Sequence, residues 1–72
     1  MEHERLKRLN RLKVVLAEKD ITAKSLAEKL GRDPATVSKW CTNSSQPTIE
    51  TIFRIAEILE VDYTELLRKQ KV

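Results

Sequence analysis

Few side chains in this sequence could act as soft metal ligands or as strong nucleophiles. There is one cysteine, Cys41, and one histidine, His3. A zinc-type site needs three or four such ligands, and His3 has no plausible nucleophile partner, so neither a metal site nor a catalytic pair can be assembled. The sequence contains no glycine-rich phosphate loop, and its carboxylates are spread over faces expected to be solvated. We therefore predict no enzyme, no metal site and no cofactor, and we expect Cys41 to be a buried, reduced thiol.

Basic residues are concentrated in the first two thirds of the chain. The net charge is +3, and residues 1–48 contain ten Lys and Arg against six Asp and Glu. Residues 49–72 contain four against five. A basic surface attracts nucleic acid, but an excess this small also fits an ordinary solvated surface, so the charge alone leaves both interpretations open.

The middle of the chain has the spacing of two short helices joined by a turn. Leu26 and Leu30 lie one turn apart and share a face of the first helix, about residues 23–30, which Thr22 should cap. Gly31 follows, where the chain can leave the helix through a left-handed conformation that glycine adopts at low cost.

The second helix of this pair, about residues 34–41, has its own start signal. Asp33 can cap it, and Pro34 stands at its first position, where a missing N–H costs nothing. Val37 and Trp40 lie three apart and should face the core, although Trp40 could instead stack on a base. Together the two helices have the layout of a helix-turn-helix, whose second helix enters the major groove of DNA.

The fold that these patterns predict is an all-α, compact five-helix bundle in a single domain spanning residues 1–72, with the helix-turn-helix at about 22–41. An amphipathic first helix, ending near residues 19–20, is indicated by apolar residues three and four apart: Leu6, Leu9, Leu12, Val15 and Leu16. One cysteine cannot form an internal disulfide, and nothing resembles a signal peptide or a membrane span. We therefore expect a cytoplasmic protein.

Two more helices follow a polar loop at residues 43–47. Thr48 should cap a fourth helix, whose apolar face would consist of Ile49, Ile52, Phe53, Ala56 and Leu59. In the last helix, Asp62 and Glu65 fit a capping box, while Val61 and Leu66 fit a hydrophobic staple.

Three stretches of this sequence match one known family at its spacing. They are Leu26-Ala-Glu-Lys-Leu-Gly31, Thr36-Val-Ser38, and the sixteen residues from Gln46 to Val61. From about Leu12 to Leu67 the chain resembles the Cro/C1-type (XRE-like) helix-turn-helix family of phage and bacterial transcriptional regulators. The resemblance implies a lambda-repressor-like bundle that commonly binds a two-fold operator as a dimer.

The resemblance also implies which residues bind DNA. The base-reading surface falls on Pro34, Ala35, Thr36, Ser38 and Lys39, although Lys39 could also be an ordinary solvent-exposed lysine. Phosphate contacts fall around Thr22, Ala23, Asn43, Ser44, Ser45 and Gln46, to which we add the basic side chains of Lys13 and Lys24. Dimer contacts are expected from Tyr63, Leu66 and Leu67, whose alternative role is to close the core of the monomer.

Some of these positions depart from the pattern of the family. Ala23 replaces a glutamine that usually holds a phosphate, a contact that is lost unless Lys24 takes it over. Pro34 and Ala35 replace polar base readers, although Ala35 could touch a thymine methyl group.

A further departure is paired. Leu16 and Cys41 stand where many members have an arginine and a glutamate that form an ion pair. Replacing both partners of a buried ion pair is often neutral, whereas losing one is costly. We therefore expect Leu16 and Cys41 to touch in a dry contact, with heavy atoms within about 4.5 Å.

The function that follows is sequence-specific binding of double-stranded DNA by a transcriptional regulator, a repressor or autoregulator. It would be a bacterial or phage-encoded protein that acts as a homodimer on a pseudo-palindromic operator and is associated with the nucleoid when bound. No membrane association and no small-molecule effector is evident. The alternative is a helical protein-interaction module, an antitoxin or adaptor with little DNA binding of its own, and the departures at Ala23, Pro34 and Ala35 favour it.

Overall fold

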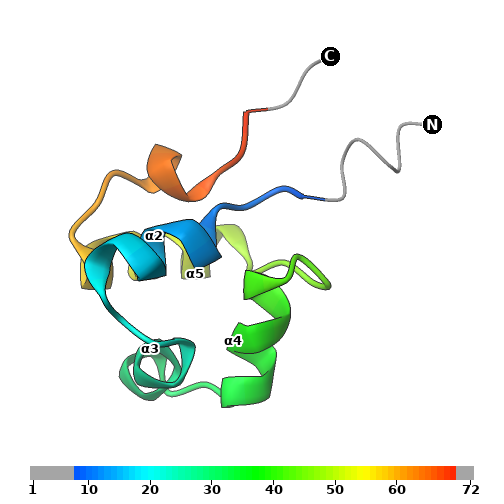
Figure 1. Cartoon of the computed structure of the whole chain (residues 1–72), viewed down its shortest axis with the longest axis vertical. Helices are drawn as coiled ribbons and strands as arrows, with labels where there is room; N and C mark the ends of the chain where they lie inside the picture. Colours follow the sequence, from blue (N-terminus) through cyan, green and yellow to red (C-terminus); the bar gives the residue numbers. More distant parts are fainter. Residues whose placement is uncertain (1–7, 70–72) are drawn as a thin grey trace.

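The computed structural model describes residues 8–69, and this part of the chain is all-α (Figure 1). Four α-helices are followed by one short 3-10 helix: α2 (Leu12–Lys19), α3 (Ala23–Leu30), α4 (Pro34–Cys41), α5 (Ile49–Leu59) and η1 (Tyr63–Leu66). The all-α class is confirmed, but the predicted count of five α-helices is not. None of the helices within residues 8–69 is long and apolar enough to cross a bilayer.

Three helices begin where their capping residues predict. The Thr22 side chain accepts a hydrogen bond from the backbone N–H of Ser25 at 3.0 Å, and the Asp33 carboxylate accepts one from Ala35 at 3.0 Å. Thr48 caps α5 by accepting from the N–H of Thr51 at 3.2 Å. Each cap satisfies a donor that has no partner inside its own helix.

The turn between α3 and α4 also forms as predicted. Gly31 ends α3 in the left-handed region at φ 69°, where its N–H reaches the carbonyl of Glu28. The chain also adopts the left-handed conformation after α4, where Asn43, two residues beyond the end of that helix, has φ 60°. Figure 1 shows α3 end-on and α4 lying in the plane of the view, so the two helices cross steeply.

The first helix is shorter than the sequence predicts, because it begins only at Leu12. Leu9 and Asn10 are not helical and Leu6 lies outside the described residues. Asn10 forms an antiparallel bridge with Leu67, flanked by backbone hydrogen bonds from Arg11 to Leu66 and from Arg68 to Leu9, both 2.8 Å. Pairing with a distant segment therefore overrides the helical periodicity in this region.

The last predicted helix is a single 3-10 turn. The Asp62 carboxylate accepts from the backbone N–H of Thr64 at 2.9 Å and from its hydroxyl at 2.8 Å, instead of reaching Glu65 as a capping box requires. Glu65 donates its N–H to the backbone carbonyl of Asp62, the i to i+3 spacing of a 3-10 helix. The two hydrogen bonds from Thr64 lower the pKa of the Asp62 carboxyl group.

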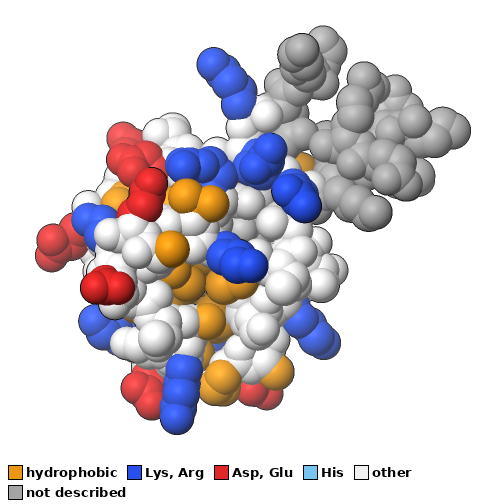
Figure 2. Space-filling view, in the orientation of Figure 1, with side chains coloured by type: hydrophobic (Ala, Val, Ile, Leu, Met, Phe, Trp, Pro, Cys, Tyr) orange, Lys and Arg blue, Asp and Glu red, His pale blue; other side chains and the backbone are white. Residues whose placement is uncertain are grey.

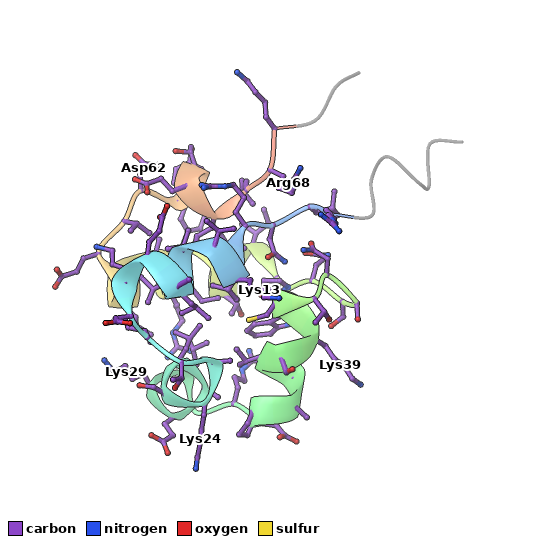
Figure 3. All side chains as sticks on the ribbon, in the orientation of Figure 1. Lys13, Lys24, Lys29, Lys39, Asp62 and Arg68 are labelled. Carbon is purple, nitrogen blue, oxygen red and sulfur yellow. The ribbon has the colours of Figure 1, made fainter. Side chains whose placement is uncertain are left out.

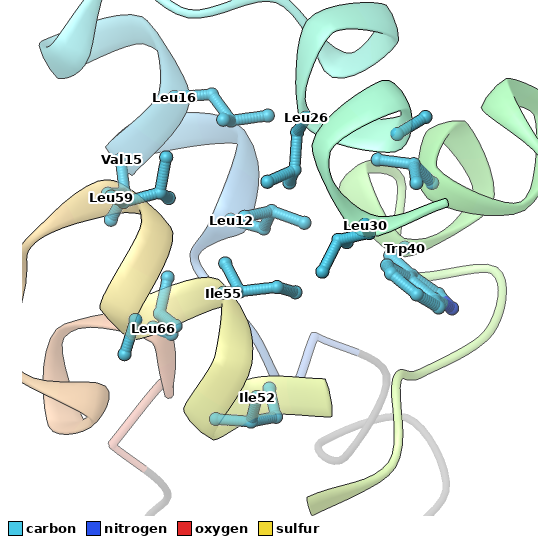
Figure 4. Close-up of a cluster of buried hydrophobic side chains, with 13 residues drawn as sticks. Leu12, Val15, Leu16, Leu26, Leu30, Trp40, Ile52, Ile55, Leu59 and Leu66 are labelled. Carbon is cyan, nitrogen blue, oxygen red and sulfur yellow. The ribbon is translucent and has the colours of Figure 1, made fainter. Parts of the chain in front are cut away.

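The core is one cluster of buried apolar side chains drawn from every element (Figure 4). Leu26, Val37 and Ile55 are completely inaccessible to solvent. Ala27 is equally inaccessible, where α3 packs against α4. A small side chain there lets the two helix backbones approach closely.

The apolar face predicted for α5 is correct only in part. Ile52, Ala56 and Leu59 are buried, but Ile49 is 71% exposed and Phe53 is 49% exposed. The core-facing stripe continues instead through Ile55, because α5 packs against α3 and η1 along that side. Ile49 and Phe53 form an exposed apolar surface on the other side.

Candidate nucleic-acid interface

Helix α4 presents one face to the core and the opposite face to solvent. Val37 is 0% exposed and Trp40 is 4% exposed, so Trp40 packs in the core as predicted and does not form a stacking platform. The outward face contains four exposed residues of the predicted reading set, namely Pro34, Ala35, Ser38 and Lys39. Thr36 is half-buried. In Figure 3 the Lys39 side chain extends away from the body of the protein.

Thr42 belongs to the same outward face, and the sequence interpretation missed it. It follows α4 directly, is exposed, and lies four residues after Ser38, one helical turn further along. Its hydroxyl is oriented by a hydrogen bond to the Lys39 carbonyl at 3.2 Å and lies 2.8 Å from the Ser44 hydroxyl. The helical spacing of residues 35, 38 and 42 could have revealed it.

The N-terminus of α3 carries the second group of residues predicted to bind DNA. Thr22 and Lys24 are exposed there, whereas Ala23 is half-buried and packs against the core. Ala23 can therefore contribute only its backbone N–H to an anion, at the positive end of the helix dipole. Lys13 is exposed on α2. In Figure 3, Lys13 lies near the centre of the molecule and Lys24 at its lower end.

Two of the predicted phosphate-binding side chains have structural roles in the loop after α4. The Asn43 Oδ1 atom accepts hydrogen bonds from the N–H groups of Leu9 at 2.9 Å and Asn10 at 3.0 Å. It also accepts one from Gln46 Nε2 at 3.0 Å. The side-chain amides of Asn43 and Gln46 thus form hydrogen bonds within the fold. Ser44 and Ser45 are exposed, and phosphate binding by these two serines stays a prediction.

Asn10 connects the start of α2 with the end of α4 and the loop that follows α4. It was not singled out from the sequence. Its Nδ2 atom donates to the Trp40 carbonyl at 3.0 Å and to Gln46 Oε1 at 2.7 Å. Its Oδ1 atom accepts from the N–H of Leu12 at 2.9 Å, which satisfies the first donor of α2. An asparagine two residues before an apolar helical run is a helix-start signal that could have identified it.

Leu16 and Cys41 line one hollow of about 410 Å³ between α2 and α4, together with Lys13, Ala23 and Ser38. Leu16 is 4% exposed and Cys41 is half-buried against the core. Burial raises the pKa of the Cys41 thiol, and the charge of Lys13 opposes this only in part. Direct contact between Leu16 and Cys41 stays a prediction. Residues 8–69 contain no cluster of side chains that could hold a metal ion.

One of the three predicted dimer residues is buried in the monomer. Leu66 is 1% exposed and belongs to the core, because η1 folds back onto α5 and α2. Tyr63 and Leu67 are 44% and 41% exposed. The Tyr63 ring packs edge-on against Phe53, with centroids 4.9 Å apart, so the exposed apolar surface joins η1 to α5.

These features are those of a helix-turn-helix protein, and the family model described as helix-turn-helix matches residues 12–66. The chain belongs to this family of DNA-binding regulators, and the resemblance to Cro/C1-type (XRE-like) members is confirmed. It is similar to a protein from Bacteroides fragilis whose crystal structure is described as that of "a putative DNA-binding protein". The two chains are 48% identical, the match covers 83% of this chain and 97% of the other, and the TM-score is 0.83. No curated protein matches the chain significantly.

Proposed function

We propose that this protein is a sequence-specific, double-stranded DNA-binding repressor or autoregulator that inserts α4 into the major groove. The observation that carries the proposal is the division of α4 into two faces. Val37 and Trp40 anchor the helix in the core, while Ala35, Ser38 and Lys39 are exposed along the opposite side. A rigidly held helix with short polar side chains and one lysine on its free face can approach base edges closely.

Base reading would rely on few side chains. Lys39 can donate to the acceptors of guanine, Ser38 and Thr42 can pair with several bases, and Ala35 can contact a thymine methyl group. Thr36, which is half-buried, would act at the margin of this surface. Pro34 has no N–H to donate, so it would shape the approach of α4 without reading a base.

Phosphate contacts would hold the helix in register. Lys13 and Lys24 are exposed and basic, and Thr22 stands at the N-terminus of α3, whose backbone N–H groups favour an anion. Such contacts carry no sequence information, so replacing Lys13 or Lys24 with alanine should weaken binding to preferred and random DNA equally.

A homodimer would use the exposed apolar surface of α5 and η1, formed by Ile49, Phe53 and Tyr63. Arg54 and Glu57 lie one helical turn apart and border the same surface. In a two-fold interface a surface meets its own copy, so Arg54 of one protomer can pair with Glu57 of the other. An apolar patch with such a rim is typical of a protein interaction site.

Substituting Phe53 with glutamate tests the dimer. The F53E variant should be monomeric by analytical ultracentrifugation and should lose affinity for a two-half-site duplex, while its affinity for a single half-site stays near the wild-type value. A variant that remains dimeric would remove this surface from the interface.

Selection from a pool of random duplex DNA tests the function itself. The expected product is a pseudo-palindrome with half-site centres about 34 Å apart, because a two-fold dimer presents its two α4 helices to successive major grooves. An unenriched pool would instead support a protein-interaction module, for which the apolar surface of α5 would be the binding face.

A further inference from the structure

Two hydroxyl groups at the end of α4 belong to one chain of hydrogen bonds. The Thr42 hydroxyl donates to the Lys39 carbonyl at 3.2 Å and lies 2.8 Å from the Ser44 hydroxyl. A hydroxyl group has one hydrogen to donate and two lone pairs that accept. Both bonds can exist together only if Ser44 donates to Thr42, so the chain runs from Ser44 through Thr42 to the Lys39 carbonyl.

The direction of this chain decides what Thr42 offers to a ligand. Its single hydrogen is used within the protein and one lone pair accepts from Ser44, so one lone pair remains. Donating to a carbonyl also polarises the hydroxyl and strengthens its oxygen as an acceptor. The neighbouring Lys39 ammonium group is the opposite, because it has donors only.

Thr42 is placed where it can meet the edge of a base. It is exposed, and Ser38 stands one helical turn before it on the same outward face. Both residues line the hollow between α2 and α4. Figure 2 shows mostly uncharged atoms on the right side of this view, where α4 lies in Figure 1, while Asp and Glu lie mainly to the left. Few carboxylates therefore stand where they would repel the backbone of a duplex that approaches Thr42.

The bases differ in what they present to such an oxygen. In the major groove, adenine and cytosine offer the hydrogens of an amino group, whereas the edges of guanine and thymine offer acceptors and, in thymine, a methyl group. Phosphate oxygens are acceptors as well. A hydroxyl oxygen with only a lone pair free therefore fits an amino group and fits neither a phosphate nor the edge of guanine.

We infer that Thr42 is a specificity-determining residue that accepts a hydrogen bond from the amino group of an adenine or a cytosine, and that Ser44 orients its hydroxyl. The inference rests on the proposed DNA-binding function and narrows the bases that Thr42 reads. It gives the Ser44 hydroxyl a positioning role in place of the phosphate contact predicted from the sequence.

Two substitutions separate the hydroxyl of Thr42 from its methyl group. Thr42→Val keeps the shape and removes the hydroxyl, whereas Thr42→Ser keeps the hydroxyl. The Lys39 carbonyl retains its bond from the Ser44 N–H at 2.8 Å, so neither change leaves that carbonyl unpaired. In selection from random duplex DNA, the wild type and Thr42→Ser should enrich the same base at one position of each half-site. Thr42→Val should lose the preference at that position alone.

Removing the amino group from the base at that position tests the bond itself. Purine replaces adenine, or 2-pyrimidinone replaces cytosine, and dissociation constants are measured for the wild type and Thr42→Val. The loss for the wild type should exceed the loss for Thr42→Val by about 2- to 12-fold, the net value of one hydrogen bond. Comparing the two losses cancels the effect of the analogue on the duplex. The same replacement at a position where Thr42→Val keeps its preference is the control and should affect both proteins equally.

Three outcomes would overturn the inference while leaving the proposed function intact. Loss of the preference in Thr42→Ser but not in Thr42→Val would assign the contact to the methyl group. An equal loss for Thr42→Val on the selected site and on a scrambled duplex would assign it to a phosphate. Equal losses for both proteins on removal of the amino group would exclude the bond. A wild-type protein that enriches no duplex would refute the proposed function itself, and the reading role of Thr42 with it.

The direction of the hydroxyl chain can be tested on the protein without DNA. Neutron diffraction from crystals of the deuterated protein locates hydroxyl deuterons. The Thr42 deuteron should point to the Lys39 carbonyl oxygen, and the Ser44 deuteron should point to the Thr42 oxygen. A Thr42 deuteron that points to Ser44 would overturn the inference, because the Ser44 hydrogen would then be free and the chain would run the other way.

Discussion

Replacing Asn10 with alanine should destabilise the fold more than replacing any other polar side chain of the loop after α4 and the segment before α2. Asn10 is 4% exposed, and its side chain makes three hydrogen bonds, to the Leu12 N–H, the Trp40 carbonyl and Gln46 Oε1. These bonds begin α2 and fasten it to the end of α4. The substitution therefore affects the element that carries the proposed reading face.

The loss in unfolding free energy depends on which polar groups remain without a hydrogen-bond partner when the Asn10 side chain is removed. The Leu12 N–H would stay buried without a partner, which costs about 1–3 kcal/mol. The Trp40 carbonyl keeps its bond from the Asn43 N–H at 3.0 Å, so losing both bonds donated by Asn10 adds only about 1 kcal/mol. A total near 3 kcal/mol is a large part of the roughly 4–11 kcal/mol expected for 72 residues.

Thermal and urea unfolding followed by circular dichroism measure this quantity. A loss of about 3 kcal/mol should lower the melting temperature by about 12–24 °C. Gln46→Ala is the matched control, because it removes one partner of Asn10 from an exposed residue and should cost only about 0.5–1.5 kcal/mol. An Asn10→Ala variant no less stable than Gln46→Ala would refute the role assigned to Asn10.

Three further outcomes are expected. Ala27→Leu should overpack the crossing of α3 and α4 and destabilise by about 1–3 kcal/mol, so an unchanged melting temperature would contradict the close approach. Cys41 should react with iodoacetamide more slowly in the folded than in the unfolded protein at pH 7–8, because its raised pKa leaves less thiolate. Mass spectrometry detects the adduct, and equal rates in the two states would count against burial of the thiol. Leu66→Ala should lower the free energy of unfolding by about 2–5 kcal/mol and Leu67→Ala by much less. The reverse order in urea unfolding would contradict the burial of Leu66 in the core.

Local signals were sufficient to predict the helix-turn-helix. Thr22 and Asp33 cap their helices through bonds that span three residues or fewer, and Gly31 ends α3 through its own backbone conformation. Val37 and Trp40 could be assigned to the core because the short helix α4 has only one apolar stripe. Each of these features depends on residues within one or two turns.

The errors occur where distant segments meet. Leu9 fits the helical period of α2, but its carbonyl pairs with Arg68, and no local pattern reveals a partner that far along the chain. Asn43 and Gln46 have the residue types of a phosphate-binding loop, and only the position of Asn10 shows that their amides are used within the fold. Pattern alone also could not tell that Phe53 lies outside the core stripe of α5.

The most direct test of DNA reading by α4 compares wild-type protein with Lys39→Ala on the selected site and on a scrambled duplex at the same salt concentration. Lys29→Ala serves as the charge control. Lys39→Ala should weaken binding to the selected site by about 1–3 kcal/mol and leave binding to scrambled DNA nearly unchanged. Equal losses on both duplexes would reduce Lys39 to a phosphate anchor, and no loss on either would contradict recognition by α4.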